Sequence, residues 1–440
     1  MTSTVAVDEL RVGMYILLEG GWLSHPFPLS AFRISSPDEI ATIRGLGLAH
    51  VRWVPEKSDV PTDGGPGAGA VAGAGTSPSP VHTPSSTPTL TPKELVAQQQ
   101  HVWLCEQRDA AQRCERQYGE AAKVMREISD KLVTQPQDAG RTAGALARAM
   151  LDKMLAADEV GIRLVSGSGA DRNGAHALNV AVVAMLIGRT MDMSNTDMQD
   201  LGVGALLHDI GKIDVPDRLR HAEDGFSPAE TNGYRDHVSK GVLQGRRMGL
   251  NADALSIVAQ HHEHADGSGF PMKLTADRLS LSARIVAIVN RYDNLCNPGA
   301  RTAALTPHEA VAMMFAHSRS RFDPPVLNAF IRMMGVYPAG SLVQLTDDRY
   351  AMVVSVNSSR PLKPRVLVHG TPGSRTGPRV AGSGTAQMLD LERQPDLGIR
   401  RSLAAAKIPP AVLAALDPRP RVSYYFESLN VMSQPAELAA

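Results

Sequence analysis

Residues 205–219, ALLHDIGKIDVPDRL, carry the strongest structural signal in this chain. The apolar run 201–207 ends at His208 and Asp209, and Gly211 follows closely, so we expect both polar side chains at a helix end, turned toward a cavity. Imidazole and carboxylate together suit iron, manganese or zinc rather than calcium. The stretch therefore predicts a metal site in a helical domain.

Further histidines strengthen this interpretation, and most lie where an apolar run begins or ends: His176, His237, His261 and His262. Chance clustering is the alternative, because the chain has 14 histidines. Two divalent ions bridged by Asp209 and a water would make that water a hydroxide near neutral pH and hold a phosphoryl group from two sides. Lys212, one turn beyond His208, is either a solvated surface residue or placed to stabilise charge on the phosphate. The set predicts a binuclear phosphoesterase.

Composition limits the remaining possibilities. The chain has 440 residues and 43% apolar residues, which is room for two or three domains with proper cores. Lys plus Arg equals Asp plus Glu at 45 each, so no bulk attraction to DNA, RNA or anionic lipid is expected. The three cysteines include no Cys-x-x-Cys pair, which suits a reducing cytosol. No signal peptide is recognisable, and the longest apolar run, 177–187, is far short of the roughly 20 residues that a membrane span needs. We expect a cytoplasmic protein without a membrane span.

Residue patterns divide the chain into five segments and predict a multidomain fold: a small α+β N-terminal module (1–55), a disordered Gly/Ala/Pro/Ser/Thr linker (56–92), a heptad-patterned connecting helix (93–140), a central all-α domain (141–337) and a small β-rich C-terminal module (338–440). Ser36-Pro37-Asp38-Glu39 predicts a helix start in the first module. Thr196 and Gln199 predict another ahead of residues 201–207. In the last module, SLVQL, YAMVVSV and 365–369 read as strands, the first two around a turn at Asp347-Asp348.

The connecting helix carries a seam with alternating steps of three and four: Leu104, Gln107, Ala111, Cys114, Tyr118, Ala121, Met125, Ile128 and Leu132. One alternative is that this helix docks on its own catalytic domain. The other is a parallel homodimer formed through residues 104–132. Small alanines and one polar position would make a weak coiled coil, so both alternatives stay open.

Three stretches together closely resemble the HD-GYP family of metal-dependent phosphohydrolases: ALLHDIGKIDVPDRL, HVSKG at 237–241 and HHEHADGSGFP at 261–271. The likeness covers roughly residues 170–335. VDELRVGMYI near the start, and PAGSLVQL and SYYFE toward the end, are similar to segments that accompany this domain in bacterial proteins.

The resemblance implies an HD-type helical domain that hydrolyses cyclic di-GMP to the linear dinucleotide or GMP in bacterial second-messenger signalling. It implies two divalent ions, iron or manganese, and phosphate or metal contact by Lys212. By motif position it assigns the metal ligands to His176, His208, Asp209, His237, His261 and His262.

Several positions depart from the family pattern. Asn290 stands where the family has its last ligand aspartate; its oxygen can still coordinate, but it brings no negative charge. Asp293 follows three residues later and points at a different angle. Members with a third metal have a glutamate where this chain has Arg172, so two ions are the upper number.

The substrate or partner loop also differs, and its candidate residues are Gly267, Gly269, Phe270, Pro271 and Arg301. Phe270 replaces the usual tyrosine of the signature. The family's Arg-Pro-Tyr segment, which helps to hold the dinucleotide, is replaced by NLCNPGART at 294–302, where Arg301 is the remaining nearby cation. Glu263 is either solvated or orients a ligand imidazole.

These departures leave more than one function open. The first is a cyclic di-GMP phosphodiesterase whose activity is weakened by Asn290. The second is a degenerate HD-GYP signalling protein that binds nucleotide or a GGDEF-type diguanylate cyclase with little turnover. Hydrolysis of another nucleotide is the third.

Overall fold

A computed structural model of the chain describes residues 3–18, 31–45, 48–59, 92–167, 169–221, 225–299, 303–317, 319–357, 359–370 and 386–429. The chain divides into two compact units, Met1–Asp109 and Ala110–Ala440. Among the described residues, no helix combines the length and hydropathy that crossing a membrane requires.

The first unit begins with the predicted α+β module. Its antiparallel sheet has the order β1-β4-β2-β3, formed by β1 (Ser3–Ala6), β2 (Tyr15–Leu17), β3 (Ala31–Arg33) and β4 (His50–Trp53). Helix α1 (Pro37–Gly45) starts at the predicted cap, where Ser36 Oγ accepts a hydrogen bond from Glu39 N at 3.3 Å. The core is apolar, with Ile16 and Ile43 fully buried.

This module extends beyond its predicted end at residue 55. Trp53 Nε1 donates to Ser58 Oγ at 2.8 Å, and Asp59 N donates to Gly13 O at 3.0 Å. The first four residues of the predicted linker therefore belong to the folded module. The rest of that prediction, up to residue 91, lies outside the described residues, and α2 begins at Pro92.

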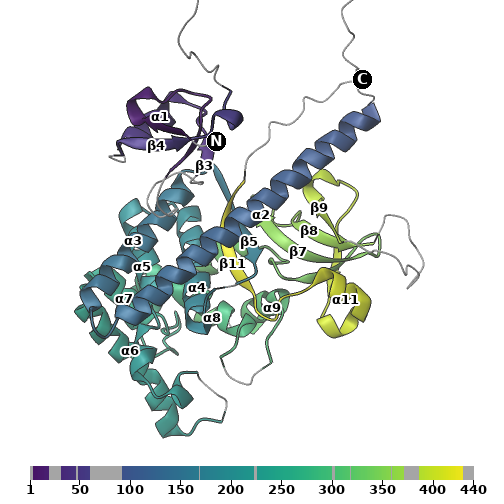
Figure 1. The fold of residues 1–440 in the computed structure, drawn as a ribbon. Coiled ribbons are helices and arrows are strands. Elements are labelled where there is room, and N and C mark those ends of the chain that lie inside the picture. Colours follow the sequence, from purple (N-terminus) through teal and green to yellow (C-terminus); the bar gives the residue numbers. More distant parts are fainter. Residues whose placement is uncertain are drawn as a thin grey trace, which may run out of the picture. The chain divides into compact units, whose positions relative to one another are not determined.

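The second unit contains the predicted central helical domain (Figure 1). Its helices are α3 (Pro136–Leu155), α4 (Arg172–Thr190), α5 (Asn195–Leu207), α6 (Pro228–Arg247), α7 (Ala252–Gln260), α8 (Leu281–Cys296), α9 (Pro307–His317) and α10 (Pro324–Met334). Residues 177–188 of α4 are all buried, which makes it the central helix. The cap predicted at Thr196 is wrong: Ser194 Oγ accepts from Asp197 N at 3.1 Å, and Thr196 lies inside α5.

An antiparallel sheet completes the second unit. Its strands are β5 (Glu159–Val165), β6 (Leu342–Leu345), β7 (Tyr350–Asn357), β8 (Arg365–His369), β9 (Gln387–Asp390), β10 (Ile399–Ser402) and β11 (Ser423–Leu429), with α11 (Pro410–Leu416) before β11. The order is β10-β6-β7-β5-β11, and β8 pairs with β7 and β9. Strands β6, β7 and β8 confirm the sequence prediction.

Strand β5 corrects the expected division between helical domain and sheet. The sequence places residues 159–165 inside an all-α segment, whereas the structure places them between β7 and β11. A seven-residue, largely apolar run is too short for its periodicity to separate a buried strand from a buried helix. The sheet is consequently built from both sides of the helical domain in sequence.

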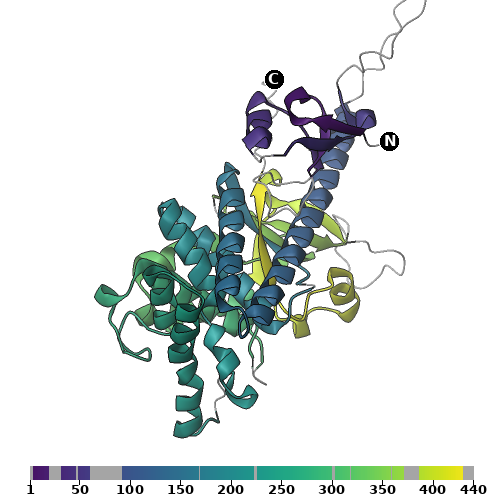
Figure 2. The same ribbon diagram turned by 60° about the vertical axis from the view of Figure 1, so that its left-hand side comes forward.

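Helix α2 (Pro92–Lys131) runs along the second unit over its C-terminal part (Figure 1, Figure 2). Its seam residues are buried from Cys114 onward. Tyr118 is fully buried and its ring packs edge-on against Tyr425, with centroids 6.3 Å apart. The Glu115 carboxylate accepts from Ser166 N at 2.7 Å and Ser166 Oγ at 2.6 Å. Because the chain already covers these positions, the structure favours the docked helix over a homodimer on the same seam.

Candidate metal centre

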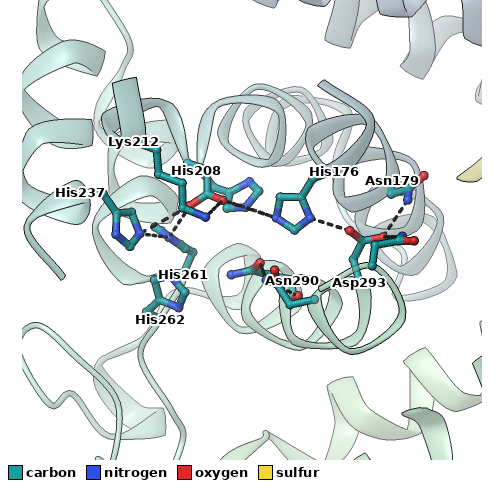
Figure 3. A network of polar contacts seen from close by, with 12 residues as sticks. His176, Asn179, His208, Lys212, His237, His261, His262, Asn290 and Asp293 are labelled. Carbon is teal, nitrogen blue, oxygen red and sulfur yellow. Dashed lines mark hydrogen bonds and ion pairs between the residues drawn. The ribbon is translucent and has the colours of Figure 1, made fainter. Parts of the chain in front are cut away.

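Helix ends and a short turn bring the predicted ligands to one place (Figure 3). The elements supply them as follows: His176 near the start of α4, His208 and Asp209 after α5, His237 within α6, and His261 and His262 after α7. Their ligand atoms form two groups within 4.8 Å: His176, His208 and Asp209 in one, and Asp209, His237, His261 and His262 in the other. Asp209 belongs to both groups.

The two oxygens of Asp209 face different histidine pairs. Its Oδ2 lies 3.5 Å from Nε2 of His176 and 3.5 Å from Nε2 of His208. Its Oδ1 lies 3.5 Å from Nε2 of His237 and 3.6 Å from Nε2 of His261. This Oδ1 is buried and has no hydrogen-bond partner in the described part of the chain. A carboxylate in this position can bridge two ions.

Gly211 sets the approach of Asp209 to α6. It lies in the 3-10 turn η4 (Ile210–Asp214), and a Cβ atom on it would fall 2.0 Å from His237 O and 2.3 Å from Gly241 N. No side chain fits there, so glycine is required for the turn to lie directly against the helix that carries His237. The sequence suggested a chain turn at Gly211; the close approach to α6 was not foreseen.

Four imidazole rings are oriented through Nδ1. Three of these atoms lie 2.6–2.8 Å from the carbonyl oxygen three residues earlier: His208 on Ala205, His237 on Tyr234 and His261 on Val258. Nδ1 of His176 lies 2.6 Å from Asp293 Oδ2. Carbonyl and carboxylate oxygens only accept, so each Nδ1 is the donor and each Nε2 is turned into the site.

The inward nitrogens face one another in pairs. Nε2 of His176 lies 3.2 Å from Nε2 of His208, and Nε2 of His237 lies 3.3 Å from Nε2 of His261. Two neutral imidazoles in this arrangement present lone pairs to each other and cannot form a hydrogen bond. A cation between them, either a proton or a metal ion, is required. The nitrogen and carboxylate donors fit two divalent transition-metal ions.

Burial sets the protonation of most ligands. It lowers the pKa of His208 to about 4 and that of His237 to about 3, and it holds the pKa of His262 well below its usual value. These imidazoles are therefore neutral at pH 7, which is the form that binds metal. Burial raises the pKa of Asp209, but the charge of Lys212 and the contacts with His208 and His176 together outweigh it and keep that pKa well below its ordinary range.

His176 differs from the other ligands. Burial opposes its protonation, but hydrogen bonds to Asp209 and Asp293 outweigh burial and raise its pKa to about 9. Negative surroundings that hold a proton here also attract a metal ion, and metal binding releases that proton.

Lys212 contacts the shared carboxylate. Its Nζ donates to Asp209 Oδ2 at 2.6 Å, and the residue is only 8% exposed. It also lines the cavity beside the metal ligands. The structure therefore excludes the solvated surface lysine that was the alternative, and it leaves the ammonium group where a phosphate oxygen can approach it.

Comparisons with known proteins support the same kind of site. Residues 154–326 match the family model described as an HD domain, and residues 2–142 match a domain of unknown function, DUF3391. The chain carries an HD domain. The match lies inside the predicted segment 141–337, and the N-terminal match includes the α+β module.

Two curated relatives of this chain are named as cyclic di-GMP enzymes. Cyclic di-GMP phosphodiesterase PA4108 of Pseudomonas aeruginosa is 27% identical over 376 residues, which cover 84% of this chain and 85% of the relative. The cyclic di-GMP phosphodiesterase response regulator RpfG of Xanthomonas campestris pv. campestris is 31% identical over 152 residues, 34% of this chain and 40% of that protein. A solved structure, Bd1817, an HDG"Y"P protein from Bdellovibrio bacteriovorus, has 14% identity and a TM-score of 0.39, covering 75% of this chain and 98% of its own.

The loop predicted to contact a substrate or partner places one residue directly against a candidate metal ligand. The Phe270 ring stacks on His262 with centroids 4.5 Å apart, and the Arg235 guanidinium lies 5.0 Å from the Phe270 ring centre. Gly267 has a φ of 75°, and a Cβ on Gly269 would fall 2.4 Å from His264 N, so both glycines permit the turn before Pro271. Arg301 lies outside the described residues.

Glu263 has neither of the roles considered from the sequence. It is 1% exposed, and its carboxylate accepts from Met272 N at 2.6 Å and Leu274 N at 3.0 Å. It therefore holds the loop that follows Phe270 and does not orient a ligand imidazole.

The sequence analysis noted Asp293 but gave it no role, and this role is the principal feature of the site that it missed. Asp293 is 1% exposed and accepts hydrogen bonds from His176, from Asn179 Nδ2 at 2.7 Å and from Asn297 Nδ2 at 3.0 Å. Its angle away from the position of Asn290 directs it to the outer nitrogen of His176. A carboxylate on the outer nitrogen of a ligand histidine fixes the ring and increases its basicity.

Asn290 lies on α8 beside the ligands and is 3% exposed (Figure 3). Its Oδ1 accepts from Asn294 Nδ2 at 2.6 Å, so its oxygen is engaged within the helix.

We expect Asn290→Asp to tighten metal binding by roughly tenfold, because it adds a charged ligand oxygen. The change in affinity is measured by dialysing the protein against increasing concentrations of a chelator and determining the remaining metal by mass spectrometry. Asn195→Asp adds the same charge at an exposed position of α5 and serves as the matched control. Equal metal retention by the two variants would show that residue 290 does not face the ions.

Proposed function

We propose that the HD domain hydrolyses a phosphodiester bond of cyclic di-GMP with two divalent ions, iron or manganese, giving the linear dinucleotide or GMP. The observation that carries this proposal is the shared carboxylate: each oxygen of Asp209 faces one pair of inward Nε2 atoms. The named activity of the relatives supports the choice of substrate.

The residues of the chain then have separable tasks. When bound, two such ions lower the pKa of a shared water and offset the charge of the phosphate. Asp209 would hold both ions, and Lys212 Nζ would supply a further positive charge at the phosphate oxygens. Asp293 holds the His176 ring. Phe270 covers His262 and limits access of water to that side of the site.

The alternative is a degenerate HD-GYP protein that binds nucleotide or a GGDEF-type diguanylate cyclase with little turnover. The internal hydrogen bond of Asn290 favours it, because an oxygen held by Asn294 does not replace the family's ligand carboxylate. The substituted Arg-Pro-Tyr segment supports it as well.

A single assay separates these functions. Protein purified without oxygen is incubated with cyclic di-GMP and ferrous or manganous ion, and the products are resolved by chromatography. Linear dinucleotide or GMP is the expected product. Full metal loading without any product would contradict the enzyme and favour the binding protein.

A further inference from the structure

A group of cationic side chains lines the cavity beside the metal ligands. It consists of Arg172 at the start of α4, Lys212, and Arg421, which lies two residues before β11; the imidazole of His221 lines the same cavity. The acids that line the described part of the same cavity are Asp209 and Asp293. Both are engaged, Asp209 by Lys212 and Asp293 by His176.

Arg172 is positioned by the loop that follows α8. Its two terminal nitrogens donate to the main-chain oxygens of Gly299 and, at 2.7 Å, Pro298. Its Nε atom is buried and has no hydrogen-bond partner among the described residues. Carbonyl oxygens satisfy part of the guanidinium group, but they carry no charge to neutralise it.

Arg421 is positioned through the residue that follows it. Val422 N donates to Asn297 Oδ1 at 3.0 Å, and Val422 O accepts from Asn179 Nδ2 at 3.0 Å and Asn297 Nδ2 at 2.8 Å. Both asparagines also donate to Asp293, which orients His176. The start of β11 is therefore tied to the support of a metal ligand, and the exposed side chain of Arg421 projects beside it.

The local field in this part of the cavity is positive. Burial lowers the pKa of Arg172, and the charge of Arg421 lowers it further. Burial, followed by the charges of Lys212 and Arg172, lowers the pKa of His221 to about 4. The two guanidinium groups repel each other, and neither forms an ion pair with a described residue. This is the arrangement expected where an anion binds.

We propose that Arg172 and Arg421 form an anion subsite for the second phosphate of a cyclic dinucleotide. The inference rests on the proposed function: such a substrate has two phosphodiesters, and only the one being cleaved lies on the metal ions. Guanidinium groups match phosphate oxygens in charge and geometry. Arg172 comes from α4 and Arg421 from the C-terminal segment. Together they take the place of the cation in the missing Arg-Pro-Tyr segment.

Arg421→Gln is the primary test, because this side chain is exposed and its removal leaves the described contacts of the fold intact. We expect the KM for cyclic di-GMP in the metal-loaded enzyme to rise about tenfold, the effect of losing one charge-assisted hydrogen bond. The fall in kcat/KM should be larger, by a similar factor, for cyclic di-GMP than for bis(p-nitrophenyl) phosphate, which has one phosphodiester. Arg419→Gln is the matched control: Arg419 is exposed, pairs with Asp417 at 3.3 Å and does not line the cavity.

Calorimetric titration of cyclic di-GMP into the same proteins gives a readout independent of turnover, with Arg172→Met as a second variant whose folding is checked by circular dichroism. About tenfold weaker binding to Arg421→Gln supports the subsite. Equal affinity, or no binding to the wild type, overturns it. If the wild type hydrolyses neither cyclic di-GMP nor bis(p-nitrophenyl) phosphate, the proposed enzymatic function is wrong. The titration then still decides whether the subsite exists.

Discussion

Asp209→Ala is expected to lower the turnover of cyclic di-GMP at least roughly a thousandfold, which is the largest effect of any single substitution in this chain. The reason is geometric: both oxygens are used, one toward each pair of histidines. Removal of the carboxylate takes a ligand from both ions and leaves the buried ammonium group of Lys212 without its partner.

The measurement is kcat at saturating manganous ion together with the metal content of the same sample. Asp217→Ala is the matched control, because Asp217 lies in the same motif but its side chain is 87% exposed and pairs with Arg220. The control should keep the turnover of the wild type. An Asp209→Ala protein that retained both ions and turnover would contradict the bridging role.

Asp293→Asn is expected to weaken metal binding by about 10–100-fold, the usual effect of losing a carboxylate behind a ligand histidine. Asparagine cannot satisfy all partners, because His176, Asn179 and Asn297 each donate a hydrogen bond to Asp293. Whichever way the amide turns, its NH2 group meets a donor. The His176 ring loses either its orientation or its negative partner.

The test of this positioning role is the dissociation constant for manganous ion, compared with kcat at saturating metal. We expect metal affinity to fall more than kcat does, since the ligands themselves are intact. Asp200→Asn is the control: Asp200 is also buried and accepts from Asn251 Nδ2 at 2.7 Å, but it is not a member of the metal cluster. If both variants changed stability alone and bound metal equally well, Asp293 would be a structural residue.

Most of the candidate ligands could be located from the sequence because they lie where an apolar run begins or ends, whereas His237 lies within α6 and was assigned by motif position. Apolar runs end at His208 and at His261, and α5 and α7 end there in the structure. Asp293 was not predictable in the same way, since its partner His176 is on a different helix and the direction of a side chain on α8 depends on tertiary packing. The contribution of Arg421 depends on how β11 returns to α4, which no local pattern shows.

Two further differences have the same origin. The sequence of the α2 seam is equally compatible with a second copy and with the chain's own sheet. The packing of Tyr118 on Tyr425 and the hydrogen bonds between Glu115 and Ser166 favour the latter. Strand β5 was assigned to a helical segment because its partners, β7 and β11, are remote in sequence. Periodicity shows that a face is buried, but it does not show what buries it.

The shared role of Asp209 is best examined by the anomalous diffraction of a crystal grown with manganous ion. Two peaks are predicted, one between His176, His208 and Asp209 and one between Asp209, His237, His261 and His262. A single peak, or peaks away from the Asp209 carboxylate, would contradict a binuclear centre built on this residue.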